Sequence, residues 1–192
     1  MEKMKLIKKT LAIYDFDNTI CMTNLKVNCY NKPKEAMFQM TPDEYSEWRA
    51  TGEYDKNPNK WVLDFSNFQG YPKDGIENHW VTSFLRKDIR NSKVIAALVT
   101  GRDELSGPKQ WMQDKNIDTK AMVLMCSGDP NKRMCFESLI CTFEPDDVII
   151  YEDGQCYIDQ CREVCQKYNL NLSATHVLAN GTFNIKNYKF QE

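Results

Sequence analysis

The sequence predicts an α/β protein with a Rossmann-like parallel sheet of about five strands flanked by helices. Short apolar runs alternate with segments of helical periodicity, which is typical of parallel strands joined by right-handed crossovers. The apolar runs are continuous rather than alternating, so they indicate strands that are buried on both faces. The length of 192 residues suits one domain with an elaboration and argues against two large independent domains.

The first predicted strand, residues 11–14, leads directly into two carboxylates. Asp15 and Asp17 follow the apolar run, one residue apart, in a polar turn. Ligands of open α/β sheets bind at the carboxyl ends of the strands. Two anions held this close repel each other, and a divalent cation such as Mg²⁺, which prefers oxygen ligands, would neutralise them.

Residues 21–75 are predicted to form a cap inserted into a core made of residues 1–20 and 76–192. This segment lacks sustained periodicity and is expected to consist of loops and short pieces, which in compact domains usually act as lids or binding elements. Its clearest helix start is Thr-Pro-Asp-Glu at 41–44, a capping box. Several aromatic residues of the segment either form its own small core or stack on a substrate ring. They are Trp48, Trp61, Phe65, Phe68 and Tyr71.

Helices and strands alternate after this insertion. Helices are expected over residues 76–90 and 108–115, from the turn at 127–130 to about residue 142, and over residues 156–168. Strands are expected over residues 93–99, 121–125, 147–151 and 172–178. Thr100 and the pair Glu152 and Asp153 directly follow two of these strands. Because parallel strands end at one edge of a sheet, these residues should meet Asp15 and Asp17 there.

The charge balance argues against a broad polyanion-binding surface. Lys and Arg total 25 against 27 Asp and Glu, and the net charge is −2. We therefore expect no extended nucleic-acid surface and no membrane partner, and any nucleic-acid contact should be local. The basic cluster ahead of the first strand is either a solvated terminus or a phosphate-binding arm. It comprises Lys3, Lys5, Lys8 and Lys9.

The cysteine pattern indicates a reduced intracellular compartment, the cytoplasm, with the nucleus left open. Eight cysteines are spread through the chain without a secretory segment ahead of them. No paired C-x-x-C motif accompanies them, which disfavours zinc. Cys161 and Cys165 lie one helical turn apart and are expected to pack on the buried face of a helix.

Taken together, these motifs resemble those of the haloacid dehalogenase (HAD) superfamily of aspartate-nucleophile phosphohydrolases. The first motif of that family, Asp-x-Asp-x-Thr after a hydrophobic strand, matches Asp15-Phe16-Asp17-Asn18-Thr19. Thr100 matches the second motif and Glu152-Asp153 the fourth. The third motif is a lone cation, for which Lys132 is the choice and Arg133 the alternative.

A narrower likeness is to the Swiss-army-knife type of HAD domain, which is associated with RNA repair. Its Leu-Thr-Gly-Arg and Ile-Tyr-Glu-Asp motifs are similar to residues 98–102 and 150–153. That type tends to continue with Arg and, three residues later, His, where this chain has Gly154 and Tyr157. Polynucleotide end-processing phosphatases of the superfamily share a similar motif style.

The resemblance implies a Mg²⁺-dependent phosphohydrolase that acts through an aspartyl-phosphate intermediate. Asp15 would be the nucleophile, and Asp17 would protonate the leaving group and later take a proton from water. Thr100 and the Gly101 amide would hold the phosphoryl oxygens, and Lys132 would offset their charge.

The same likeness implies a set of metal ligands. The Asp15 carboxylate, the Asp17 backbone carbonyl and Asp153 would bind Mg²⁺, and Glu152 would assist directly or through a metal-held water. Arg102 either adds a second positive charge or lies on the surface.

Three classes of function remain open at this stage. The substrate is a phosphorylated end of RNA or DNA, or else a small phosphorylated metabolite or nucleotide. The alternative from another class is a catalytically silent phosphate-binding or scaffold protein. The sequence leaves the oligomeric state open.

Overall fold

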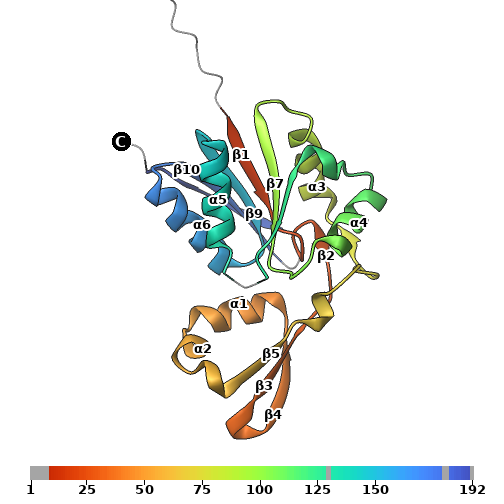
Figure 1. The fold of residues 1–192 in the computed structure, drawn as a ribbon, viewed down its shortest axis with the longest axis vertical. Helices are drawn as coiled ribbons and strands as arrows, with labels where there is room; N and C mark the ends of the chain where they lie inside the picture. Colours follow the sequence, from red (N-terminus) through yellow and green to blue (C-terminus); the bar gives the residue numbers. More distant parts are fainter. Residues whose placement is uncertain (1–8, 129–130, 179–181, 191–192) are drawn as a thin grey trace, which may run out of the picture.

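The computed structural model describes residues 9–128, 131–178 and 182–190, and these form a larger layered core and a smaller unit that faces one edge of it (Figure 1). Lys3, Lys5 and Lys8 of the basic cluster, and residues 129–130 of the predicted turn, lie outside the described residues. The smaller unit contains α1, α2 and the strands β3 to β5.

Six strands of the described chain form the core sheet, in the order β11-β10-β9-β1-β7-β8. The parallel strands are β1 (Thr10–Tyr14), β7 (Val94–Thr100), β8 (Val123–Cys126), β9 (Asp147–Glu152) and β10 (Asn171–Val177). The strand β11 (Phe183–Tyr188) pairs antiparallel with β10 at the edge. From β1 the chain continues to β7 and β8 on one side, and later to β9 and β10 on the other. This reversal of strand order opens a crevice at the carboxyl ends of β1 and β9.

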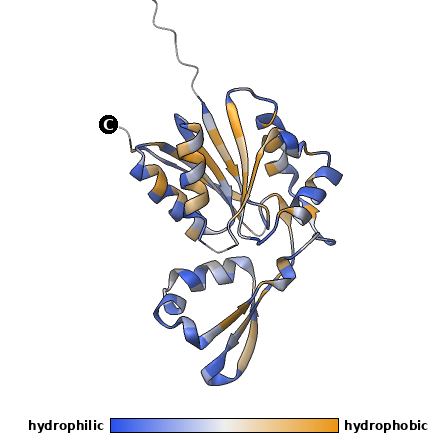
Figure 2. Ribbon diagram, viewed as in Figure 1, coloured by the Kyte–Doolittle hydropathy of each residue, from blue (hydrophilic) through white to orange (hydrophobic). Residues whose placement is uncertain are grey.

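Helices cover both faces of this sheet. They are α3 (His79–Asp88), α4 (Ser106–Asp114), α5 (Arg133–Phe143) and α6 (Gln155–Lys167). Leu11 and Ile13 of β1 belong to the apolar cluster that includes α5 and α6, whereas Ala12 and Tyr14 belong to the cluster that includes α3 and α4. Both faces of β1 are therefore buried, which explains its continuous apolar run, and the central strands form the hydrophobic layer in Figure 2.

The insertion between β2 (Cys21–Met22) and β6 (Ile76–Glu77), which pair with each other, carries its own sheet. Three antiparallel strands lie in the order β4-β3-β5: β3 (Val27–Asn31), β4 (Ala36–Met40) and β5 (Trp61–Asp64). The helices are α1 (Pro42–Ala50) and α2 (Glu53–Lys56), and the short 3-10 turns are η1 (Lys32–Lys34), η2 (Pro58–Lys60) and η3 (Ser66–Phe68). A fourth such turn, η4 (Thr119–Ala121), lies in the core. Helix α1 packs against α6, so the insertion rests over the strand ends.

The predicted capping box at the start of α1 is confirmed. The Thr41 hydroxyl accepts from the Glu44 amide at 3.2 Å, and the Glu44 carboxylate accepts from the Thr41 amide at 2.8 Å. Met40 and Tyr45, on either side of this box, are both buried in the small core of the insertion. Such a hydrophobic staple fixes the angle at which the chain enters the helix.

Three expectations about the elements were wrong. The sheet has a sixth strand, β11, whose residues are mostly exposed and therefore leave little apolar signal. The helix expected from residue 76 begins at His79, because the Asn78 side chain caps it while Ile76 and Glu77 pair with β2. The insertion holds a sheet rather than loops, and its strand β4 is exposed at four of five positions, which hides its pattern.

The architecture also bears on the two helix cysteines and on membrane-spanning helices. Cys161 and Cys165 are fully buried in the core against α5 and the sheet, as expected of packing residues. Among the helices of the described ranges, none combines the length and the apolar character that crossing a bilayer requires.

Candidate active site

The turn after β1 presents Asp15 and Asp17 at the edge of the sheet. The Asp15 amide donates to the Tyr151 carbonyl at 3.0 Å, which continues the β1–β9 pairing by one residue. Asn18 adopts a left-handed conformation with φ 56°, and its amide donates to the Cys21 carbonyl at 2.7 Å. These bonds reverse the chain within a few residues and hold both carboxylates in fixed positions.

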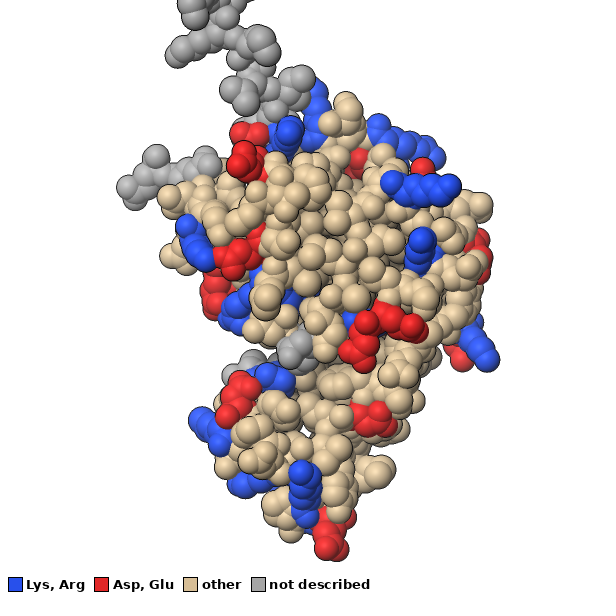
Figure 3. Space-filling view, viewed as in Figure 1, with Lys and Arg blue, Asp and Glu red and all other residues tan. Residues whose placement is uncertain are grey.

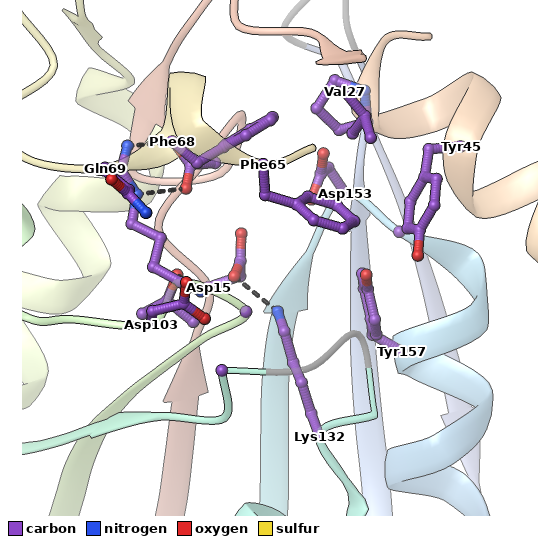
Figure 4. Close-up of a pocket in the computed structure, with 17 residues that line it drawn as sticks. Asp15, Val27, Tyr45, Phe65, Phe68, Gln69, Asp103, Lys132, Asp153 and Tyr157 are labelled. Carbon is purple, nitrogen blue, oxygen red and sulfur yellow. Dashed lines mark hydrogen bonds and ion pairs between the residues drawn. The ribbon is translucent and has the colours of Figure 1, made fainter. Parts of the chain in front are cut away.

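Lys132 lies between two carboxylates at the ends of neighbouring strands. Its Nζ donates to Asp15 Oδ1 at 2.6 Å and to Glu152 Oε2 at 2.8 Å. The Gln160 side chain holds the Lys132 backbone by accepting from its amide at 2.8 Å. Arg133, the alternative cation of the sequence analysis, is partly exposed and pairs with Glu163 on the surface. Lys132 is therefore the cation that reaches the predicted site, and Figure 4 shows it pointing at Asp15.

Burial shifts the proton affinities of this cluster. It raises the pKa of Asp15 to about 8, helped by the negative charge of Glu152 and opposed by Lys132. Burial and Glu152 together raise the pKa of Asp153 well above its ordinary value. Burial alone would lower the pKa of Lys132, but Asp15 and Glu152 raise it well above the usual range. The three carboxyl groups of the cluster thus carry more potential negative charge than the single positive charge of Lys132 can balance.

The carboxylates of this cluster fit a magnesium ion. Oxygens of Asp15, Glu152 and Asp153 lie within 4.8 Å of one another, and within the described residues this is the one group of potential ligands so close together. All three are buried, and carboxylate oxygen is the ligand that Mg²⁺ prefers. The backbone of Asp153 is in contact with His176, whose Nε2 lies 2.7 Å from the Asp153 carbonyl oxygen. The expected contribution of the Asp17 carbonyl stays a prediction.

Asp17 has a different partner from Asp15. Arg102 Nε and Nη2 donate to its two carboxylate oxygens at 2.8 and 2.7 Å, a bidentate pair. The Arg102 side chain is only 2% exposed, so it belongs to the site and not to the surface. Two carboxylates on one turn are thus held by separate cations.

The second predicted motif lies at the end of β7. Thr100 is buried, and Gly101 follows it at the wall of the same cavity as Asp15. The Thr100 carbonyl accepts from the Ser127 amide at 2.9 Å, which ties this strand end to the loop that leads toward Lys132. Every residue predicted for the site therefore lies at one edge of the sheet, although the phosphate-binding roles of Thr100 and Gly101 stay predictions.

Sequence reasoning gave no role to Tyr157, which packs directly against the site. The Lys132 Nζ lies 4.3 Å from the centre of the Tyr157 ring, within the range of a cation–π contact. A Cβ at Gly154 would lie 2.5 Å from a Tyr157 ring carbon, so the ring needs glycine there. Gly154 and Tyr157 are also the two positions at which the chain departs from the Swiss-army-knife pattern. This paired departure was the sequence signal that could have pointed to Tyr157 as a residue of the site.

The cavity above these residues has a volume of about 120 Å³ and is lined by residues of both the core and the insertion. Phe65 and Phe68 pack in the small core of the insertion, as one of the two interpretations expects, and they also line this cavity, whereas stacking on a substrate ring stays a prediction. Trp48 and Trp61 contact each other at 5.0 Å within the insertion, whereas Tyr71 lines a neighbouring cavity. Figure 4 shows the labelled rings of Phe65, Tyr45 and Tyr157 around the space next to Asp15 and Lys132.

Comparison with solved structures supports the α/β class. No protein-family model matches the chain, and a search of curated proteins found no match. The fold is similar to two crystal structures of the Legionella pneumophila effector Ceg4. The one with an N-terminal TEV protease cleavage sequence has a TM-score of 0.55 at 14% identity, covering 91% of this chain and 88% of that one. The one with an N-terminal yeast Hog1p sequence has a TM-score of 0.56 at 15% identity, covering 92% and 90%. This likeness concerns the fold alone: a mixed α/β chain whose mostly parallel central sheet is flanked by helices.

Proposed function

We propose that this chain is a Mg²⁺-dependent phosphohydrolase of the HAD superfamily that acts through an aspartyl-phosphate intermediate. The observation that carries the proposal is the separate pairing of the two carboxylates on one turn. Asp15 contacts Lys132 in a cluster with excess negative charge, and Asp17 is held by Arg102. Carboxylates placed in distinct environments are typical of sites that divide nucleophilic and acid–base roles.

In the first step, a carboxylate oxygen of Asp15 attacks the phosphorus atom of a phosphomonoester. The bond from phosphorus to the leaving oxygen breaks as the bond to Asp15 forms, and Asp17 gives a proton to the leaving oxygen. Lys132 contacts Asp15 Oδ1, which leaves Oδ2 outside that hydrogen bond. Lys132 also reduces the repulsion between Asp15 and the incoming dianion.

In the second step, water attacks the aspartyl-phosphate. Asp17 takes a proton from that water, the bond between Asp15 and phosphorus breaks, and inorganic phosphate leaves. Asp15, Asp153 and Glu152 would hold Mg²⁺, which supplies positive charge to offset the carboxylates and the transferring phosphoryl group. Thr100 and the Gly101 amide would orient the phosphoryl oxygens.

Among the possible substrates, we favour a small phosphomonoester with an uncharged leaving group over a polynucleotide end. The insertion lines the cavity with uncharged side chains: Val27, Pro42, Tyr45, Phe65, Phe68 and Gln69. Both cations of the cavity, Lys132 and Arg102, already pair with carboxylates. A polynucleotide depends on cations that contact its further phosphates. Basic and acidic side chains are instead interspersed over the face shown in Figure 3.

The enzyme proposal is tested by release of phosphate from an aryl phosphate with and without Mg²⁺. We expect Mg²⁺-dependent release by the native chain and its loss in Asp15→Asn. Asp118→Asn is the matched control, since Asp118 is exposed in a surface turn and asparagine also caps such turns. Absence of metal-dependent release across a broad phosphate panel, with phosphate binding retained, would favour the silent binding protein instead.

The substrate class is tested by a second panel. Oligonucleotides with 3′-phosphate, 5′-phosphate or 2′,3′-cyclic phosphate ends are compared with sugar phosphates, nucleotides and uncharged phosphomonoesters. We expect kcat/KM to be at least about tenfold higher for the uncharged small esters, which is about 1.4 kcal/mol of transition-state discrimination. A tenfold preference for any oligonucleotide end would reverse the choice.

A further inference from the structure

Arg102 joins the candidate acid–base residue to the segment that connects the insertion with the core. We call residues 69–75, between η3 and β6, the strap. While Arg102 Nε and Nη2 hold Asp17, its Nη1 donates to the carbonyl of Gly70 in the strap at 2.8 Å. The guanidinium also lies over the Phe16 ring, 5.1 Å from its centre. Because the guanidinium group is planar and rigid, a single orientation of the group makes all of these contacts at once.

The Gly70 peptide is in turn seated on the start of α4. Its amide donates to Glu104 Oε1 at 3.1 Å, and its φ of 72° is in the left-handed region that favours glycine. Its carbonyl lies so close to Gly107 of α4 that a Cβ at position 107 would be 1.8 Å from the oxygen. Glu104 therefore holds the Gly70 amide, and the absence of a side chain at Gly107 leaves room for the Gly70 carbonyl that accepts from Arg102.

We propose that Gly70, Arg102 and Asp17 form a positioning relay, in which the strap must sit on α4 for Asp17 to be oriented for proton transfer. This inference rests on the proposed function, because it takes Asp17 as the acid–base residue. Arg102 acts through Asp17 and is a positioning residue. Each carboxylate oxygen has two lone pairs, so an oxygen bonded to Arg102 retains one for the proton in transfer. A displaced Gly70 carbonyl removes one of the three hydrogen bonds of the guanidinium and lets it turn, and Asp17 turns with it.

The relay predicts a dependence on the leaving group. In Gly107→Ala, the added methyl group pushes the Gly70 carbonyl away, while Asp17 and Arg102 themselves are not substituted. An alkyl phosphate needs its leaving oxygen protonated, whereas p-nitrophenyl phosphate needs this far less. We expect kcat for the alkyl ester to fall at least about tenfold, part of the 10²–10⁴ that acid–base catalysis contributes. We expect kcat for p-nitrophenyl phosphate to fall less than about threefold and KM to stay unchanged for both.

Matched variants distinguish the selective effect that the relay predicts from a general loss of folding or activity. Glu104→Ala removes the acceptor of the Gly70 amide and should reproduce the selective loss, which also covers the case in which Gly107→Ala does not fold. Glu104→Gln keeps an oxygen acceptor at that position and should restore activity toward the alkyl ester. Lys109→Ala, on the exposed face of α4, should leave both esters unaffected. Equal losses on both esters, or no loss in either Gly107→Ala or Glu104→Ala, would overturn the relay.

A spectroscopic readout tests the relay without catalysis. The Arg102 Nε–H proton should give a protected NMR signal in the native chain, assigned by its disappearance in Arg102→Lys. This signal should lose protection in Gly107→Ala and Glu104→Ala and keep it in Lys109→Ala. An unchanged signal in both Gly107→Ala and Glu104→Ala would refute the relay even in an active enzyme. Loss of protection in a chain that hydrolyses no phosphate ester would instead leave the link standing and refute the proposed function.

Discussion

At the scale of single residues, Lys132 has the most demanding position. Its ammonium group is buried between Asp15 and Glu152, so removing it leaves two buried carboxylates without their cation. We expect Lys132→Met to lower the free energy of unfolding of the metal-free protein by about 3–5 kcal/mol, the usual cost of breaking a buried pair. Urea unfolding at pH 8 measures this change.

The neighbouring cation supplies the control for that measurement. Arg133 is one residue along and pairs with Glu163 at the surface, and such exposed pairs contribute about 0–1 kcal/mol. Arg133→Met should therefore change stability by less than about 1 kcal/mol and should keep phosphatase activity. A similar effect of both substitutions would show that the ion pairs at Lys132 contribute no more than surface pairs do.

Tyr157 contacts the candidate site although it belongs to none of the sequence motifs. Its ring faces Lys132, so Tyr157→Phe keeps the cation–π contact and should retain activity within about threefold. Tyr157→Ala removes a ring from the wall of the cavity, which should cost about 3 kcal/mol or less, since the side chain is only partly buried, and most of the activity. Thermal unfolding and phosphate release measure the two effects. If Tyr157→Phe is as damaging as Tyr157→Ala, the hydroxyl and not the ring is the group that matters.

At the scale of secondary-structure elements, α1 links the stability of the insertion to the shape of the cavity. Tyr45 lines the cavity from this helix, just after the capping box. Thr41→Ala removes the N-cap and should destabilise the helix by about 1 kcal/mol. Hydrogen exchange of the α1 amides should then accelerate, and KM should rise because the cavity wall loosens. Glu47→Gln, at an exposed position of the same helix, should change neither quantity.

The elements that the sequence predicted well are those whose residues are buried on both faces. The run Leu11 to Tyr14 is apolar because each side of β1 packs on a helical layer, and the acids that follow it are therefore recognisable as a strand end. Strands β4 and β11 are largely exposed, so packing leaves no continuous apolar run in them. The alternation of Phe183 and Ile185 with polar residues was the one weak signal for β11.

The same physical reason limits how much of the candidate site could be predicted. Asp15, Thr100 and Asp153 follow buried strands, so sequence order alone brings them to one edge of the sheet. The partner of Arg102, the ring of Tyr157 and the seat of Gly70 on Gly107 depend on side-chain packing between segments far apart in the chain. No local pattern encodes such contacts.

At the scale of the whole molecule, the charge of the site makes stability depend on pH and metal. Burial raises the pKa of Asp15 from 3.8 to about 8, so between those values the folded chain binds more protons than the unfolded chain. Stability contributed by the raised pKa is present at low pH and is lost as pH rises toward 8. Each proton of difference changes the free energy of unfolding by about 1.4 kcal/mol per pH unit. We expect the Tm of the metal-free protein to fall between pH 5.5 and pH 8.

Magnesium should reverse this trend, because it binds the ionised carboxylates and competes with protons for them. Ligand that binds only the folded state raises stability in proportion to the logarithm of its concentration above Kd. The increase in Tm on adding Mg²⁺ should therefore be larger at pH 8 than at pH 5.5, as differential scanning fluorimetry would measure. Asp15→Asn removes one titrating carboxylate and one ligand, so it should flatten the metal-free pH profile and weaken the Mg²⁺ response together. A Tm that rises with pH in the metal-free chain, with no response to Mg²⁺ at pH 8, would contradict both the raised pKa of Asp15 and the metal site built on it.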